Sequence, residues 1–263
     1  MTQLLTYSFF QYAMIAVCLI ATASAIIGTY IITRRMVALA GGITHACFGG
    51  LGLGYFLGIN PVVMAGVFAV GSSLGVEWMS RHLRIREDSA TAVIWSVGMA
   101  VGVLFVFLTP GYVPELNSFL FGNILTVTPA DIAVFAGFTA LLIAFVATYY
   151  SRIVACAFDR DFAAVCGLPV RFISITMTVL TAVCIVLTIR LVGIMLLMSM
   201  FSLPIMIAEC HARTYGRIML LSALTAIVAS VLGLFISAFV DIPCSALIVL
   251  ILAAVYIPAR IIK

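Results

Sequence analysis

The stretch YSFFQYAMIAVCLIATASAIIGTYIIT, residues 7–33, decides the fold class of this protein. It is uncharged and long enough to cross the roughly 30 Å hydrocarbon core of a bilayer, which takes about 20 apolar helical residues. No charge stands anywhere in residues 1–33, so no positively charged segment precedes the apolar run. We therefore expect a retained membrane helix and no cleavable signal peptide.

The remaining sequence has the same character, since 65% of the 263 residues are hydrophobic and only 8% are charged. Soluble cores of this size cannot bury so much apolar surface, and disordered scaffolds need more polar residues. The net charge of +4 comes from short basic clusters between apolar runs, so we expect no nucleic-acid partner. The only lysine is Lys263, so the chain has no Gly-x-x-x-x-Gly-Lys-Ser/Thr loop. Any ATP-driven step must occur in another polypeptide.

Charges and Pro or Gly breaks divide the chain into about nine apolar stretches. We predict an all-α polytopic membrane protein with 8–9 transmembrane helices in one transmembrane domain, residues 1–263. The predicted spans are 7–33, 36–58, 60–80, 89–109, 129–150, 172–190, 191–208, 217–238 and 243–260. Only Arg190 separates the sixth and seventh, so one of these two could be a broken or re-entrant helix.

The basic residues predict the orientation, because Lys and Arg collect in cytoplasmic loops. With the N-terminus outside, twelve of the thirteen basic residues fall on the cytoplasmic side and Arg190 is the exception. The twelve are Arg34, Arg35, Arg81, Arg84, Arg86, Arg152, Arg160, Arg171, Arg213, Arg217, Arg260 and Lys263. This count favours an odd number of spans and a cytoplasmic C-terminus.

The cytoplasmic connection at about residues 151–171 is expected to hold one or two short helices. Asp159 suits a helix start, and Gly167 suits the position just past a helix end. The apolar residues near one face are Phe158, Phe162 and Val165. A half-apolar helical segment of this kind suits docking into a groove of a partner protein, and the alternative is a helix lying on the lipid surface.

His45 is an ionisable residue near the middle of a predicted span, ten residues after Arg35. Ionisable residues inside a membrane are costly and are functional candidates by default. No carboxylate in the same span can pair with it. A hydrogen bond to Thr44 or to a backbone carbonyl would instead make His45 an ordinary core residue.

Small residues recur at every fourth position beside His45, which predicts a helix face that a neighbouring helix can approach closely. They are Gly42, Ala46, Gly50, Gly54 and Gly58. On a regular helix Cys47 points away from His45, and it would join it as a ligand only if the helix were irregular. Imidazole suits zinc, manganese or iron, and a thiolate would favour zinc.

Two acidic residues stand near predicted span ends. Asp131 follows Thr128 and Pro129, a pattern typical of a helix start. Asp241 precedes Pro243 and could cap the last span at the outer surface or stand at the mouth of a transport pathway.

Five motifs in this order resemble those of the membrane permease subunits of bacterial metal-ion (zinc, manganese and iron) ABC transporters, and the resemblance runs over nearly the whole chain. The motifs are Gly28–Met36 leading to Ile43–Ala46 and Gly50; Leu120–Leu125; Phe158–Ala163 with Gly167; Val192–Leu197 with Pro204; and Asp241–Pro243. No one motif is decisive, but together they are specific.

The resemblance implies an ABC importer permease fold in the bacterial inner membrane. It implies a homodimer of this chain, two cytoplasmic ATP-binding subunits and an extracytoplasmic metal-binding protein. The chain itself would be no enzyme and would hold no cofactor. Its cargo would be Zn²⁺, Mn²⁺ or Fe²⁺, with zinc as the first candidate.

By the same resemblance, His45 matches the family's intramembrane histidine, which contributes to a metal path at the dimer centre. Cys47 and Asp241 are candidate helpers. The family usually has an aspartate four residues earlier, where this chain has Gly41. The departure implies a weaker, more imidazole-dependent site, a carboxylate supplied from elsewhere, or altered selectivity.

The resemblance also identifies the segment that would dock on the ATP-binding subunit. Its expected contact residues are Phe158, Asp159, Asp161, Phe162, Ala163 and Gly167.

Other functions remain as alternatives. A permease for a metal chelate or a cobalamin-like ligand shares the architecture, although such chains usually run longer. A proton- or sodium-driven secondary transporter would show two related halves, broken helices and paired intramembrane acids, which are not evident. An intramembrane enzyme would need His45 beside the Ser72–Ser73 pair, and nothing in the sequence brings them together.

Overall fold

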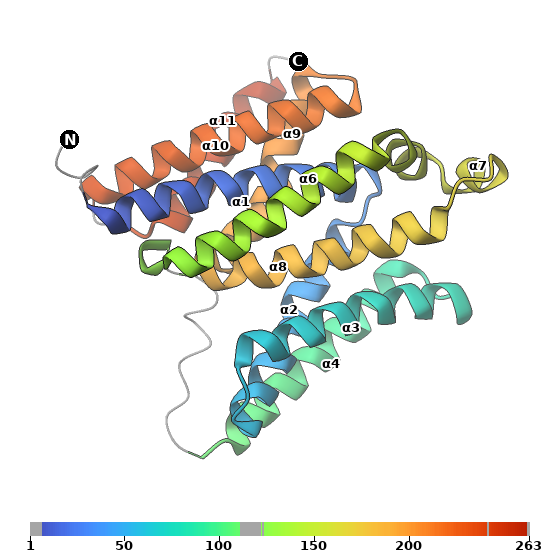
Figure 1. The fold of residues 1–263 in the computed structure, drawn as a ribbon, viewed down its shortest axis with the longest axis horizontal. Coiled ribbons are helices and arrows are strands. Elements are labelled where there is room, and N and C mark those ends of the chain that lie inside the picture. The colour runs from blue at the N-terminus through green and yellow to red at the C-terminus, as the bar shows by residue number, and fades with distance from the viewer. Residues whose placement is uncertain (1–6, 111–121, 123, 241, 262–263) are drawn as a thin grey trace. The chain divides into compact units, whose positions relative to one another are not determined.

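The computed structural model describes residues 7–110, 122, 124–240 and 242–261, and these residues form helices and connections without a strand (Figure 1). The helices are α1 (Ser8–Thr33), α2 (Val37–Leu57), α3 (Pro61–His82), α4 (Glu87–Leu108), the 3₁₀ turn η2 (Ile124–Thr126), α6 (Pro129–Phe158), α7 (Arg160–Val165), α8 (Val170–Met200), α9 (Leu203–His211), α10 (Tyr215–Val240) and α11 (Cys244–Ile261). The predicted all-α, multi-pass class is confirmed.

Within the described residues, eight helical stretches are long and apolar enough to cross a membrane. The two spans predicted at 172–190 and 191–208 lie in one stretch of 42 residues, Val170–His211. That stretch is interrupted at Gly193, which has φ 79° and ψ 173°, a conformation that glycine adopts readily because it has no Cβ.

The helices group into two compact units. One unit contains α1, η2, α6, α9, α10, α11 and the part of α8 from Thr188 onward. The other contains α2, α3, α4 and the part of α8 up to Leu187. A single transmembrane domain stays a prediction.

Helix α1 is largely buried inside the first unit. Its Phe10 ring contacts the Phe235 ring of α10 at a centroid distance of 5.3 Å. Farther along, a Cβ on Gly28 would lie 2.9 Å from the Phe201 carbonyl oxygen. Glycine at this position therefore lets α1 lie directly against the backbone that leads into α9.

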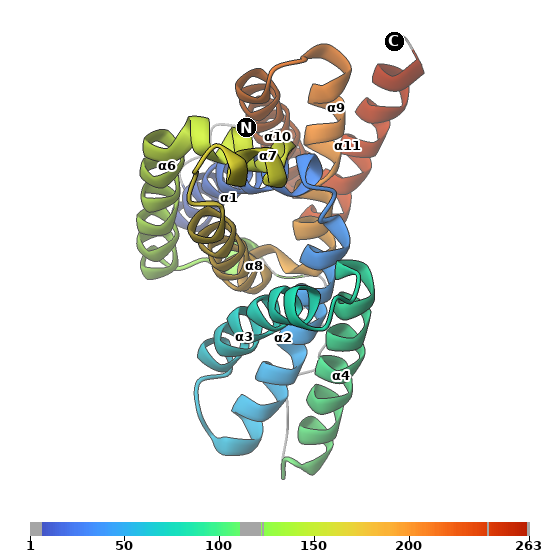
Figure 2. The ribbon, with the colours of Figure 1, turned by 90° about the vertical axis from the view of Figure 1, so that its right-hand side faces the viewer.

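In the second unit α2 lies between α3 and α4, as Figure 2 shows. The contact with α4 runs backbone to backbone, since a Cβ on Gly98 would lie 2.6 Å from the Ala46 Cα. One turn later, a Cβ on Gly102 would lie 2.5 Å from the Phe48 carbonyl oxygen. Two helices come this close only where both present small residues or bare backbone.

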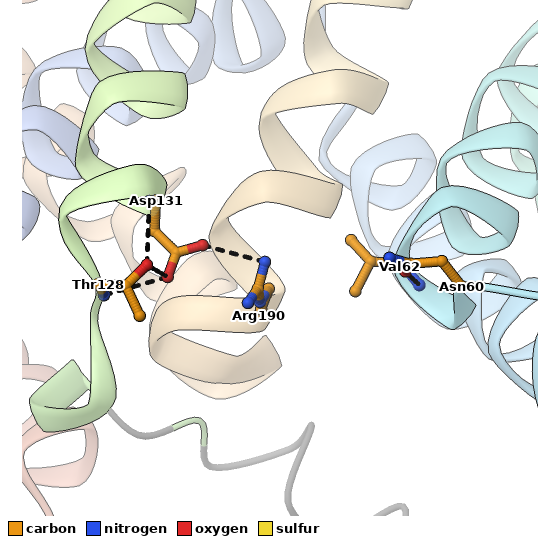
Figure 3. A network of polar contacts seen from close by, with 5 residues as sticks. All are labelled: Asn60, Val62, Thr128, Asp131 and Arg190. Atoms are coloured by element: carbon orange, nitrogen blue, oxygen red, sulfur yellow. Dashed lines mark hydrogen bonds and ion pairs between the residues drawn. The ribbon is translucent and has the colours of Figure 1, made fainter.

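Helix α6 begins with a capping box that also holds an ion pair (Figure 3). The Asp131 backbone N–H donates to Thr128 Oγ1 at 3.2 Å, and the Thr128 backbone N–H donates back to Asp131 Oδ2 at 3.1 Å. The other carboxylate oxygen, Asp131 Oδ1, lies 3.0 Å from Arg190 Nη1. The helix start predicted at Asp131 is therefore present, and its carboxylate also ties α6 to α8.

This ion pair explains why Arg190 departs from the distribution of the other basic residues. In the predicted orientation α6 begins at the outer surface, so its partner Arg190 stands at that surface too. At 1.5 Å per residue, 42 helical residues would extend roughly 63 Å, about twice the hydrocarbon thickness. This length fits two crossings joined by a turn near Gly193. The total number of spans would then be odd, as the positions of the basic residues predict.

The break at Gly193 is also a packing site. Gly122, with φ +62°, sits so close that a Cβ on it would overlap the Gly193 nitrogen and the Val192 carbonyl carbon. The connection before α6 is therefore fitted against the interruption in Val170–His211.

We predict that a phosphatase reporter, active only outside the cytoplasm, is active when fused after Arg190 and inactive when fused after Arg213. A cytoplasm-specific fluorescent protein fused after Lys263 should fluoresce. Equal reporter activity after Arg190 and Arg213 would contradict the double crossing.

We also predict that Gly98→Ala lowers the free energy of unfolding by about 1–3 kcal/mol, the usual cost of forcing atoms into a packed interface. Gly71→Ala is the matched control, because nothing lies within 4 Å of a Cβ at that position. Thermal unfolding of the purified variants in detergent measures both. Equal melting temperatures would show that the α2–α4 contact is not tight.

Candidate functional site

His45 projects from the part of α2 that packs against α4. Its ring stacks on the Trp95 indole with a centroid distance of 4.4 Å and an interplanar angle of 3°. The Phe48 ring lies farther away, at 6.3 Å and 24°. The stack follows from the backbone contact, because Ala46 and Gly98, which touch, are close neighbours of His45 and Trp95 in sequence.

One ring nitrogen of His45 has no hydrogen bond to the residues that the structure describes. His45 Nδ1 is buried and has no hydrogen-bond partner among the described residues. Thr44, the partner considered from sequence, donates its hydroxyl proton to the Ala40 carbonyl at 2.7 Å. Hydrogen bonds and metal bonds to imidazole lie in the ring plane, so stacking on Trp95 covers a face and leaves the nitrogen lone pair free.

The other candidate ligands do not join His45. Cys47 is buried, and its thiol donates to the Ile43 carbonyl at 3.1 Å. Because α2 is continuous from Val37 to Leu57, Cys47 points about 200° around the helix from His45. Asp241 lies outside the described residues. Within the part of the chain that the structure describes, no group of three or more His, Cys, Asp or Glu side chains could hold a metal ion.

The predicted small-residue stripe is shared between two neighbours. Gly42 and Ala46 face α4, where they meet Thr91 and Gly98. Gly50 and Gly54 face α3, and their nearest neighbours are Met64, Ala65 and Pro61. Gly58 has no such contact; it ends α2 in the left-handed conformation with φ 67°.

The predicted docking segment contains the short helix α7. Helix α6 continues to Phe158, so much of the connection expected from residue 151 onward is helical. Asp159 stands between α6 and α7, and Asp161 lies in the first turn of α7. Gly167, with φ +73°, follows the helix end, where the Leu168 N–H donates to the Ala163 carbonyl at 3.1 Å.

Most of the large apolar side chains of this segment are exposed. Phe158 is 69% exposed, Phe162 65% and Val165 88%, whereas Ala163 is fully buried. Phe158 ends α6, whereas Phe162 and Val165 lie on α7. Three exposed apolar side chains on neighbouring helical turns form a surface suited to a protein partner.

Trp95 is the neighbour of His45 that sequence reasoning missed. A usable signal was present in the predicted span 89–109, where Gly98 and Gly102 stand four residues apart like the small residues beside His45. If the small residues of the two spans are placed against each other, Trp95 lies close to His45.

Comparison with known proteins gives the family. Residues 6–263 match the ABC 3 transport family. A "probable metal transport system membrane protein" of Chlamydia pneumoniae is 35% identical, with 92% of this chain and 85% of that protein covered. The manganese transport system membrane protein MntC of Listeria innocua is 27% identical, with 96% of this chain and 90% of that protein covered.

The structure of PsaBC from Streptococcus pneumoniae in complex with Fab is 26% identical to this chain, with a TM-score of 0.85 and coverage of 97% of this chain and 92% of that chain. The family predicted from the five motifs is confirmed. The chain is a multi-pass bacterial membrane protein that belongs to the ABC 3 transport family.

Proposed function

We propose that this chain is the permease subunit of an ATP-driven importer for a divalent transition metal. It works as a homodimer with two cytoplasmic ATP-binding subunits and an extracytoplasmic metal-binding protein. The observation that carries the proposal is His45, an intramembrane imidazole whose Nδ1 has no hydrogen-bond partner among the described residues. The metal and manganese transport names of the relatives support a metal cargo.

One imidazole per chain would bind a metal ion weakly. Weak binding suits a transport path. A metal held by a full set of protein ligands would not leave, whereas conduction needs binding that is easily reversed. In a homodimer the second His45 would supply a second nitrogen.

Zinc is the first candidate cargo, with manganese and ferrous iron as the others. Zinc binds imidazole nitrogen at about 2.0–2.1 Å, whereas manganese favours carboxylate, carbonyl and water oxygens. Gly41 offers no side-chain oxygen four residues before His45. This donor set favours zinc.

The ATP-binding subunit would dock on α7 and its flanking residues. Phe158, Phe162 and Val165 would enter an apolar groove, and Asp159, Asp161 and Gly167 would set the ends of the short helix. Because α7 directly follows α6 and precedes α8, closure of the nucleotide sites would move these two helices and alternate access to His45.

We predict that His45→Ala abolishes accumulation of the transported metal in metal-starved cells that express the complete transporter. Zinc, manganese and iron are measured by elemental analysis, with membrane levels of the chain checked. His82→Ala is the matched control, because His82 lies at the end of α3 and should leave accumulation unchanged.

The outcomes separate the alternatives. If deletion of the chain changes no metal, metal import is wrong, and accumulation of a chelated metal or a cobalamin-like ligand becomes the quantity to measure. If deletion has an effect and His45→Ala has none, transport stands and His45 is a core histidine.

We predict that Val165→Asp weakens binding of the ATP-binding subunit about 30-fold, because a charge in an apolar docking surface costs about 2 kcal/mol or more. Co-purification and titration of that subunit measure the effect. Leu83→Asp, a change at an exposed apolar residue beyond the end of α3, is the control and should bind as the unchanged chain does. Equal binding by the two variants would place the docking surface elsewhere.

A further inference from the structure

We propose that Trp95 is a positioning residue for His45. Its indole fixes the plane of the imidazole ring in the orientation that binds the metal. The inference rests on the proposed function, since it assigns how this chain orients its metal-binding side chain without an acidic neighbour.

The geometry of the pair is that of a face-to-face stack. The ring centroids lie 4.4 Å apart and the ring planes differ by only 3°. The indole therefore restrains rotation of the imidazole about its bond to Cβ. The indole contacts a face of the imidazole and forms no hydrogen bond to its ring nitrogens. A face contact therefore fixes the plane of the ring without occupying either nitrogen.

Metal-binding histidines usually obtain this orientation in another way. Their second ring nitrogen donates to a carboxylate, a backbone carbonyl or a water molecule, which fixes the ring and the tautomer. Here His45 Nδ1 has no such partner among the described residues, and Gly41 provides no carboxylate on the preceding turn. Of the two ring contacts of His45 among the described residues, the indole of Trp95 is the closer and the more nearly parallel.

Trp95 is itself held in place. Its Nε1–H lies 3.0 Å from the Met99 sulfur, one turn farther along α4. The backbone contact between Gly98 and Ala46 fixes the separation of the two helices that carry the rings. The indole is 39% exposed and lies beside the close α2–α4 contact.

The chain contains a natural control for this pair. It has two tryptophans, and Trp78 also stacks on a histidine, His82, at 5.4 Å and 24°. Both residues of the control pair lie on α3, at its end, so the control repeats the aromatic contact without the proposed metal path.

The experiment compares ATP-driven zinc uptake by the complete transporter carrying Trp95→Leu, Trp95→Phe or Trp78→Leu. We expect Trp95→Leu to raise the zinc concentration for half-maximal uptake by about 10-fold or more, the usual effect of losing the group that orients a metal ligand. The maximal rate should change by less than about twofold, because the moving parts are intact. Trp95→Phe keeps a stacked ring and should restore the half-maximal concentration to near that of the unchanged chain.

Fluorescence gives a second readout that needs no transport. In the Trp78→Phe variant Trp95 is the only tryptophan, so its emission reports on the stack. Zinc should change this emission with a saturable dependence, and the additional change His45→Ala should remove the response.

A half-maximal concentration in Trp95→Leu equal to that in Trp78→Leu, while His45→Ala abolishes uptake, would overturn the inference and leave the proposed function standing. If Trp95→Leu does not fold, an absent zinc response in the Trp78→Phe variant would overturn it. Absence of any zinc, manganese or iron uptake by the unchanged transporter would instead overturn the proposed function.

Discussion

The backbone-to-backbone contact between α2 and α4 is the constraint on which the candidate site depends. At Ala46 and Gly98 the two helices approach so closely that even a methyl group on Gly98 would displace its neighbour. This contact brings His45 and Trp95 into a parallel stack, and His45 Nδ1 has no hydrogen-bond partner among the described residues. The proposed metal binding by His45 therefore depends on the α2–α4 packing, because separating these helices would remove the restraint on the imidazole ring.

The outer end of the first unit shows how two of the family motifs depend on each other. Gly122 of the motif Leu120–Leu125 fits against Gly193 of the motif Val192–Leu197, 71 residues later. Nearby, Asp131 closes the capping box of α6 and binds Arg190. A helix interruption inside a membrane is tolerated where other protein covers it, and Gly122 lies directly against this one.

The apolar runs predicted the helices, because a bilayer leaves the backbone no other way to satisfy its hydrogen bonds. The capping pattern at Thr128–Asp131 and the break near Arg190 were also readable, since both depend on residues close in sequence. The partners of Arg190, Gly193 and His45 were not, because each is distant in sequence and no periodicity within one span specifies it. The length of α6 was underestimated because its helix continues past the charged residue Arg152.

We propose that ATP hydrolysis by partner subunits drives a transition metal through this chain. The most direct test is uptake of radioactive zinc, manganese or iron into proteoliposomes containing the purified complete transporter. We expect accumulation that requires ATP and the metal-binding protein and is unaffected by collapse of proton and sodium gradients. Accumulation driven by an ion gradient without ATP, or ATP hydrolysis without movement of any of the three metals, would contradict it.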